Sequence, residues 1–171
     1  MTDVLCIGTT GMLAGCVRSL VSKGNHAMCI ARSQQSLDAL AGSVPPEQAN
    51  RLSLHACDYR DLAGLRSELE HLLCRPHAAI CWVHTPAEPV LRLIRDRYPE
   101  MDLLRVRGSS TQRPADEAAG ADRLVTLGFV IEHARSRWLT HHEISAGVYD
   151  AFVSGARESI VGVIEPWDQS P

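Results

Sequence analysis

Short apolar runs alternate with longer amphipathic segments over the first hundred residues. The apolar runs predict strands over 4–7, 26–31, 52–57, 78–83 and 103–107. Between them, apolar positions at a spacing of three and four residues predict helices over about 12–23, 33–41, 61–73 (its start at 58 is an alternative) and 88–98. Repeated strand–helix–strand units of this kind predict an α/β fold with a doubly wound, mostly parallel sheet and helices on both faces.

The last third of the chain follows a different pattern. Residues 108–121 are small and polar and predict a loop, whereas 123–131 reads as one strong strand. A short strand at 137–139 precedes Thr140, which with Glu143 forms a capping box that opens a helix running to about 154. Residues 159–164 predict a closing edge strand. We find no repeat or linker that would separate a second domain, so 1–171 is predicted to form a single domain.

Composition narrows the classes of function. Of 171 residues, 45% are hydrophobic and 22% charged, and the net charge of −3 argues against a nucleic-acid binder with a basic face. The apolar runs fall short of the ~20 residues that span a bilayer, and no secretory signal precedes them, so a cytoplasmic protein is predicted. The six cysteines contain no Cys-x-x-Cys pair, which predicts buried, reduced thiols and no metal site.

A glycine turn joins the first predicted strand to the first predicted helix. It consists of Gly8, Thr9, Thr10, Gly11, Met12 and Leu13, with Ala14 following. Two glycines let backbone N–H groups approach a pyrophosphate, and the helix N-terminus adds unpaired donors and partial positive charge. The turn therefore predicts a dinucleotide site in a Rossmann-like domain, the alternative being a tight turn without a ligand.

The residues after the second and third strands indicate which dinucleotide. Arg32 stands where an acidic residue would bind the ribose hydroxyls of NAD, and a cation there suits a 2′-phosphate, with Ser33 beside it. NADP(H) is therefore the predicted cofactor, unless Arg32 is simply solvated. Asp58 and Tyr59 follow the third strand and are expected at the adenine edge, although Asp58 could equally cap the next helix.

Together these residues resemble the short-chain dehydrogenase/reductase superfamily over roughly residues 1–110, especially its atypical members with a Gly-x-x-Gly-x-x-Ala/Gly turn. The matching pieces are 8–14, 30–33, 57–58 and 83–87, the last standing where that family has an Asn-Asn-Ala-Gly loop. The resemblance implies an NAD(P)-dependent oxidoreductase whose catalytic groups are a serine and a Tyr-x-x-x-Lys pair.

The catalytic pair of that family is missing. The chain has one lysine, Lys23, in the first predicted helix, and neither Tyr59, Tyr98 nor Tyr149 is followed by lysine at the required spacing. In the family, the lysine lowers the pKa of the tyrosine, which delivers the proton. The usual alcohol/ketone mechanism is therefore not encoded.

Replacement catalytic groups are expected where strands end beside the cofactor. His84 after the fourth strand is the candidate proton donor, with Thr85 as a hydrogen-bond partner, or else an ordinary loop histidine. Ser109, with Ser110, follows the fifth strand. Arg137 and Trp138, before a helix N-terminus, suit an anionic group on a substrate; the alternative is a core tryptophan flanked by surface charge.

Three functions fit this pattern. The first is a compact NADPH-dependent reductase acting on a small molecule, an imine or an activated alkene or carbonyl, because such substrates need hydride positioning more than a Tyr-Lys pair. The second is a non-catalytic NADP(H)-binding sensor or partner subunit. The third is a domain that binds another nucleotide or a sugar. A homodimer or higher homo-oligomer is expected through the strands after Arg123.

Overall fold

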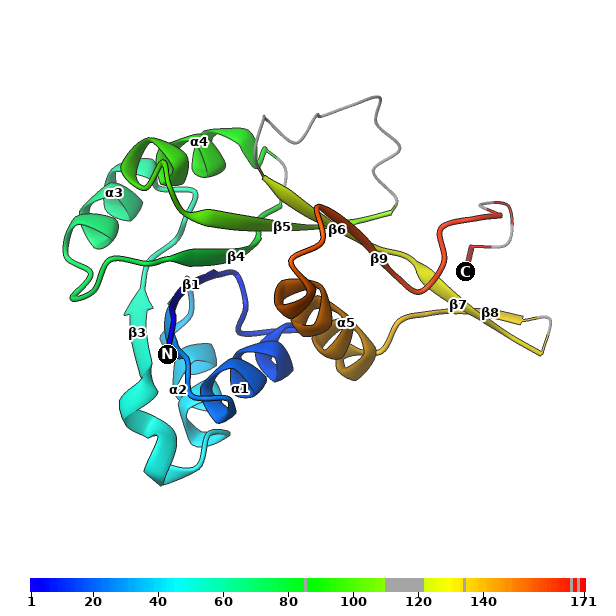
Figure 1. The fold of residues 1–171 in the computed structure, drawn as a ribbon, viewed down its shortest axis with the longest axis horizontal. Coiled ribbons are helices and arrows are strands. Elements are labelled where there is room, and N and C mark those ends of the chain that lie inside the picture. Colours follow the sequence, from blue (N-terminus) through cyan, green and yellow to red (C-terminus); the bar gives the residue numbers. More distant parts are fainter. Residues whose placement is uncertain (85, 110–121, 134, 167, 169) are drawn as a thin grey trace.

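A seven-stranded parallel sheet forms the centre of the computed structural model, which describes all residues except 85, 110–121, 134, 167 and 169. Its strand order is β3-β2-β1-β4-β5-β6-β9, and every neighbouring pair is parallel (Figure 1). The strands are β1 (Asp3–Ile7), β2 (His26–Ala31), β3 (Leu52–Ala56), β4 (Ala78–Trp82), β5 (Asp102–Gly108), β6 (Arg123–Leu127) and β9 (Glu158–Val161). The predicted α/β class is confirmed.

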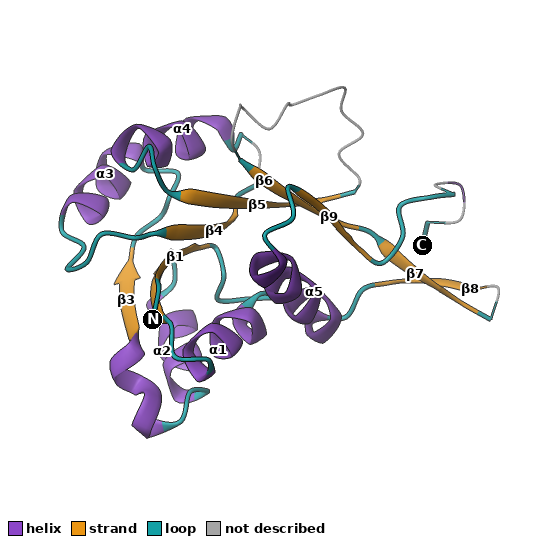
Figure 2. Cartoon of the chain, in the orientation of Figure 1, coloured by secondary structure: helices purple, strands orange, loops and turns teal. Residues whose placement is uncertain are grey.

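Helices cover both faces of this sheet (Figure 2). They are α1 (Ala14–Ser22), α2 (Gln34–Gly42), α3 (Leu62–Glu70), α4 (Glu88–Arg97) and α5 (His141–Ser154), with a short 3₁₀ helix at Pro46–Arg51. Successive side chains of a strand point to opposite faces, so Val4 and Cys6 pack with α1, α2 and α5, whereas Leu5 and Ile7 pack with α3 and α4. This two-faced core explains why the central strands are apolar at nearly every position.

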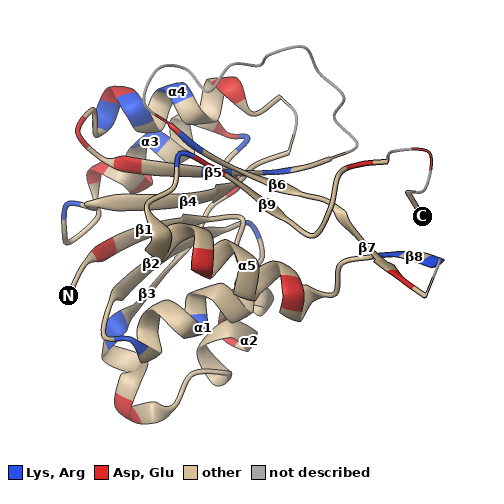
Figure 3. Ribbon diagram, turned by 45° about the vertical axis from the view of Figure 1, so that its right-hand side comes forward, with Lys and Arg blue, Asp and Glu red and all other residues tan. Residues whose placement is uncertain are grey.

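The outer surface carries charge of both signs. Lys/Arg and Asp/Glu positions are interspersed on α3 and α4 in the view of Figure 3. None of the helices among the described residues is long and apolar enough to cross a membrane.

The single strand predicted at 123–131 is wrong. The chain leaves the parallel sheet at Gly128, where β6 ends, and continues as β7 (Phe129–Glu132), which pairs antiparallel with β8 (Arg135–Trp138) in a two-stranded hairpin. A Cβ at Gly128 would overlap the carbonyl group of Val163. Phe129 and Val163 exchange backbone hydrogen bonds of 2.9 and 2.8 Å, so this close crossing ends the strand.

Helix α5 is fixed at both ends. At its start, Glu143 N–H donates to Thr140 Oγ1 at 3.2 Å and Thr140 N–H donates to Glu143 Oε2 at 2.8 Å, which confirms the predicted capping box. At its other end, the buried guanidinium of Arg123 donates to the carbonyl oxygens of Ala151 and Ala156 and to Asp102. The helix is thereby held to the amino ends of β5 and β6.

Candidate functional site

A cavity of about 210 Å³ lies at the carboxyl ends of the first strands, where the strand order reverses between β1 and β4. Clefts at this point of an open α/β sheet are where such folds bind ligands. It is lined by Gly8, Thr10, Ala31, Arg32, Ser33, Ser36, Asp58, Tyr59, Arg60, Trp82 and His84. The structure thus brings together the predicted residues of four separate segments in what we call the nucleotide cavity.

The two glycines of the turn differ in whether the protein's own packing requires them. Gly8 has a φ of +71°, and a Cβ there would overlap the carbonyl oxygen of Trp82, so the protein's own packing requires it. A Cβ at Gly11 would meet no atom within 4 Å. Packing therefore does not explain Gly11, which leaves space open above the turn.

The first turn of α1 has no side-chain cap. The helix begins at Ala14, two residues later than predicted, and its N-cap Leu13 supplies no side-chain hydrogen bond. Ala14 N–H donates to Gly11 O at 3.0 Å, so an anion at this helix start would be met by the N–H groups that follow Ala14. Leu13 and Thr9 are buried, so they can reach a ligand only through their backbone. The Thr9 hydroxyl has no partner among the described residues.

Arg32 has the charge and the exposure that binding a phosphate group requires. Its side chain is exposed and forms no hydrogen bond or ion pair with any other residue in the described part of the chain. Ser33 lines the same cavity while its hydroxyl caps α2 by accepting from Ser36 N–H at 3.2 Å. Sequence reasoning missed Ser36 and Arg60. Arg60 stands two residues after Asp58, a spacing that could have indicated it.

Asp58 does not cap the following helix. Asp61 does, because its carboxylate accepts from the N–H groups of Ala63 and Gly64 at 3.2 and 3.1 Å. Asp58 Oδ1 instead accepts from Arg60 N–H at 3.0 Å and leaves Asp58 in the cavity wall. Tyr59 borders the same cavity, and its hydroxyl oxygen lies 3.5 Å from the backbone nitrogen of His84.

The two catalytic candidates line different cavities. His84 is exposed in the nucleotide cavity, its ring edge-on to Trp82 at a centroid distance of 5.3 Å. Ser109 borders a second cavity of about 130 Å³, together with Met12, Gly108, Leu127, Gly128, Trp138, Leu139 and Ile144. We call this the apolar cavity. Thr85 and Ser110 lie outside the described residues.

Ser109 is the main polar side chain of the apolar cavity. Its backbone N–H donates to Leu127 O at 2.8 Å, which fixes the residue at the end of β5. Its Oγ is buried and has no hydrogen-bond partner among the described residues. A buried hydroxyl without a partner loses free energy relative to its hydrated state, so the Ser109 hydroxyl keeps unused hydrogen-bonding capacity in the wall of the apolar cavity. Met12 places this cavity next to the glycine turn.

The tyrosines and the lysine lie elsewhere. Lys23 ends α1, and the hydroxyl of Tyr98 donates to the carbonyl oxygen of Leu69 at 2.7 Å, on the α3–α4 face. Tyr149 packs from α5 against the core of the opposite face. None of the three lines the apolar cavity.

Arg137 is already neutralised. Its guanidinium binds Glu132 at 2.7 Å and Glu143 at 2.9 Å. The hydrogen bonds from Arg137, followed by those from Thr140, lower the pKa of Glu143 to about 2, and the two carboxylates raise the pKa of Arg137. The predicted role in binding an anionic substrate group therefore lacks a free cation at Arg137. Trp138 is flanked by this surface charge but is 51% exposed rather than part of the core.

A further cavity, of about 550 Å³, lies between α1 and α5 and includes Gly11, Arg18, His141 and His142. Those histidines and Arg18 are exposed. We place the candidate site in the nucleotide and apolar cavities, which contain the strand ends and the Ser109 hydroxyl, and at the glycine turn between them, whose Gly11 and Met12 also border the larger cavity.

Comparison with known proteins establishes the fold. No family model matches the sequence, and no curated protein matches it. Among solved structures, the bulky-bulky ketone specific alcohol dehydrogenase from Comamonas testosteroni is 13% identical with a TM-score of 0.70, covering 98% of this chain and 90% of that one. A short-chain dehydrogenase from Sphingobium yanoikuyae in complex with NADPH is 14% identical, with a TM-score of 0.68 and coverages of 98% and 91%.

Serine dehydrogenase from Escherichia coli is similar at 15% identity and a TM-score of 0.62, over 94% of this chain and 96% of its own. The chain therefore has the Rossmann-like fold of the short-chain dehydrogenase/reductases, as the sequence resemblance implied. At these identities the likeness concerns the fold, and the function has to be argued from the site.

Proposed function

We propose that this protein is a compact NADPH-dependent reductase of a small molecule, an imine or an activated alkene or carbonyl, that works without a Tyr-Lys pair. The observation that carries the proposal is the juxtaposition of two cavities at one glycine turn. One contains an unpaired arginine at the end of β2, and the other is apolar and contains the buried, unpartnered hydroxyl of Ser109.

The residues of the nucleotide cavity fit NADP(H). Arg32, with Arg60 and the Ser33 hydroxyl, would hold the 2′-phosphate, because a guanidinium pairs with phosphate oxygens through charge-assisted hydrogen bonds. The uncapped start of α1 and the open space at Gly11 would receive the pyrophosphate. Asp58 and Tyr59 would border the adenine. When bound, the cofactor supplies a hydride.

Ser109 would orient the substrate. Its hydroxyl can donate to a carbonyl oxygen or accept from the N–H of a protonated imine, and the rest of the cavity lining is mostly apolar. A protonated imine already carries its proton and needs only correct placement next to the cofactor. Such a substrate makes the missing tyrosine dispensable. The role of His84 as a proton donor stays a prediction, because its side chain lines the nucleotide cavity and not the apolar cavity that contains Ser109.

The cofactor claim is tested by titrating NADPH and NADH while following tryptophan fluorescence. We expect NADPH to bind at least about tenfold more tightly than NADH, and Arg32→Glu to abolish that preference, since a hydrogen bond to a charged group contributes about 1.5–3 kcal/mol. Arg92→Glu on α4 makes the same charge change at an exposed residue outside both cavities. Absence of binding, or an equal effect of Arg92→Glu, would contradict the proposal.

The second candidate is a non-catalytic NADP(H)-binding sensor or partner subunit, which the missing Tyr-Lys pair favours. The two are separated by following NADPH absorbance with cyclic imines and enones once binding has been shown. Tight NADPH binding without turnover of any of these substrates would favour the sensor.

A further inference from the structure

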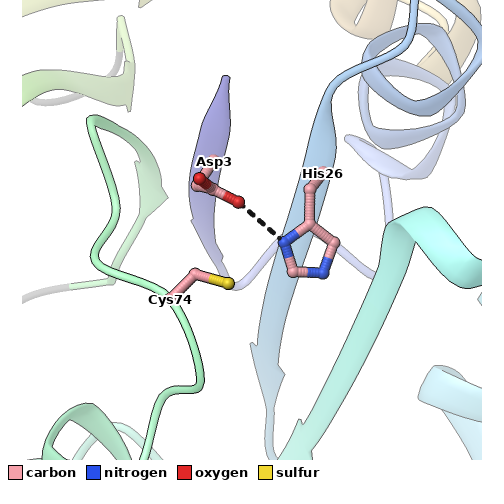
Figure 4. Close-up of side chains that lie close together, drawn as sticks. All are labelled: Asp3, His26 and Cys74. Atoms are coloured by element: carbon pink, nitrogen blue, oxygen red, sulfur yellow. Dashed lines mark hydrogen bonds and ion pairs between the residues drawn. The ribbon is translucent and has the colours of Figure 1, made fainter. Parts of the chain in front are cut away.

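Three side chains with metal-binding atoms meet at the amino ends of the strands, opposite the nucleotide cavity. Asp3 and His26 are the first residues of β1 and β2 and are direct neighbours in the strand pairing. Cys74 lies between α3 and β4, in a segment tied to β1 where His77 N–H donates to Asp3 O at 2.9 Å. Figure 4 shows the Cys74 sulfur pointing toward the Asp3–His26 pair. One ligand atom from each residue lies within 4.8 Å of the other two.

His26 is oriented as a metal ligand would be. Its Nδ1 lies 3.0 Å from Asp3 Oδ1, and its Nε2 lies 2.8 Å from the hydroxyl oxygen of Ser53. When that hydroxyl accepts the Nε2 proton, the lone pair of Nδ1 faces Asp3. A second hydrogen bond of this kind fixes the tautomer and ring orientation of metal-bound histidines.

The donor set selects the metal. A carboxylate oxygen, an imidazole nitrogen and a thiolate sulfur are together the ligands of zinc, whereas magnesium and calcium take oxygen ligands. The carboxylate and the thiolate balance the two positive charges of the ion. Zinc bonds of about 2.0–2.3 Å put tetrahedral ligand atoms roughly 3.3–3.8 Å apart. The exposed Cys74 side chain can supply the movement of about an ångström that closes the widest pair.

We infer that Asp3, His26 and Cys74 form a zinc site that joins β1, β2 and the segment leading into β4. The fourth position is left to water or to His77, whose Nδ1 is 3.7 Å from Asp3 Oδ2. On binding, the Cys74 thiol gives its proton to solvent and the thiolate bonds to the metal. The site lies at the opposite ends of the strands from the cofactor, so it fastens the fold and takes no part in hydride transfer.

Cobalt(II) tests the site directly. The full chain, prepared without a histidine tag and stripped with a chelator, is titrated with CoCl₂. We expect one equivalent to produce a thiolate-to-cobalt charge-transfer band and the visible bands of tetrahedral cobalt, both removed by ZnCl₂. Cys74→Ser should abolish the charge-transfer band, and Cys57→Ser, a change at a half-buried cysteine in another part of the fold, should keep it. Ser53→Ala should weaken cobalt binding by about tenfold.

Alkylation provides a readout within one sample. Zinc should slow the modification of Cys74 by iodoacetamide at least tenfold and leave the modification rate of Cys57 unchanged. The inference is overturned if wild-type protein gives no charge-transfer band, if Cys74→Ser gives the same band, or if zinc protects Cys57 as much as Cys74. The last two results would identify an adventitious ion only.

Discussion

The two parts of the chain build their cavities in different ways. In residues 1–108, most of the wall of the nucleotide cavity comes from residues at or just after the carboxyl end of a strand, so the order of strands and turns in the sequence largely determines the site. The apolar cavity is formed where residues 123–171 meet Met12, Gly108 and Ser109, so it depends on contacts between distant segments, such as the crossing of Gly128 and Val163. Local motifs therefore specify where a cofactor can bind, whereas long-range packing shapes what can lie beside it.

The largest expected effect is a loss of stability at Gly8, in the first part of the chain. Gly8→Ala should lower the free energy of unfolding by about 2–5 kcal/mol, because alanine is strained at a φ of +71° and its Cβ overlaps the Trp82 carbonyl oxygen. Gly11→Ala should change the free energy of unfolding by less than about 0.5 kcal/mol, because its Cβ meets no protein atom within 4 Å. It should weaken NADPH binding, because the added Cβ occupies the space that the pyrophosphate would fill. Urea unfolding and NADPH titration of both variants check this. Equal stability losses would contradict the assignment of packing to Gly8 and ligand space to Gly11.

Ser109→Ala tests the junction between the two parts. The change removes a buried hydroxyl without a described partner, so stability should stay constant or rise by about 1 kcal/mol. Turnover should fall about 10–100-fold, because the hydrogen bond to substrate is lost. Denaturant unfolding and NADPH oxidation measure the two quantities on one preparation. A loss of stability with unchanged turnover would assign Ser109 to the fold instead.

The smallest effect concerns the hairpin in the second part. Glu143→Gln preserves the capping box with Thr140 but removes the charge facing Arg137. The pKa of Glu143 falls from 4.5 to about 2 on folding, so its stabilisation is present above about pH 4.5 and is lost toward pH 2. Thermal unfolding should show a slightly less stable variant at pH 7. The difference should close between pH 4.5 and 2, and a constant difference would exclude the ion pair as its cause.

Much of the sheet could be predicted because buried parallel strands are apolar at nearly every position. The strands of the first part were found to within a residue or two, and the capping box located α5. The strand at 123–131 could not be divided correctly, because the apolar pattern continues through Gly128. Strand β6 ends where the carbonyl group of Val163 packs against Gly128, and this long-range contact leaves no signal in the local sequence.

The candidate site divides in the same way. Arg32, Ser33 and Asp58 could be named because they follow strand ends, whereas Ser36 and Arg60 depend on how the next turn folds back. The separation of His84 from Ser109 is a property of the three-dimensional arrangement. So is the cluster of Asp3, His26 and Cys74, whose members come from separate segments with no recognisable spacing.

The strand order also bears on how the chain emerges during synthesis. From β4 onward, each strand adds to the edge formed by its predecessor in the sheet, through β5 and β6 to β9. Because domains fold from the N-terminal end as they are synthesised, strands β1 to β5 can pair while the last third of the chain is still in the ribosome. Arg123 arrives before the α5 carbonyl groups that it binds. Asp102 precedes Arg123 in the chain and can neutralise its charge at once, whereas the carbonyl oxygens of Ala151 and Ala156 become available only after α5 has left the exit tunnel.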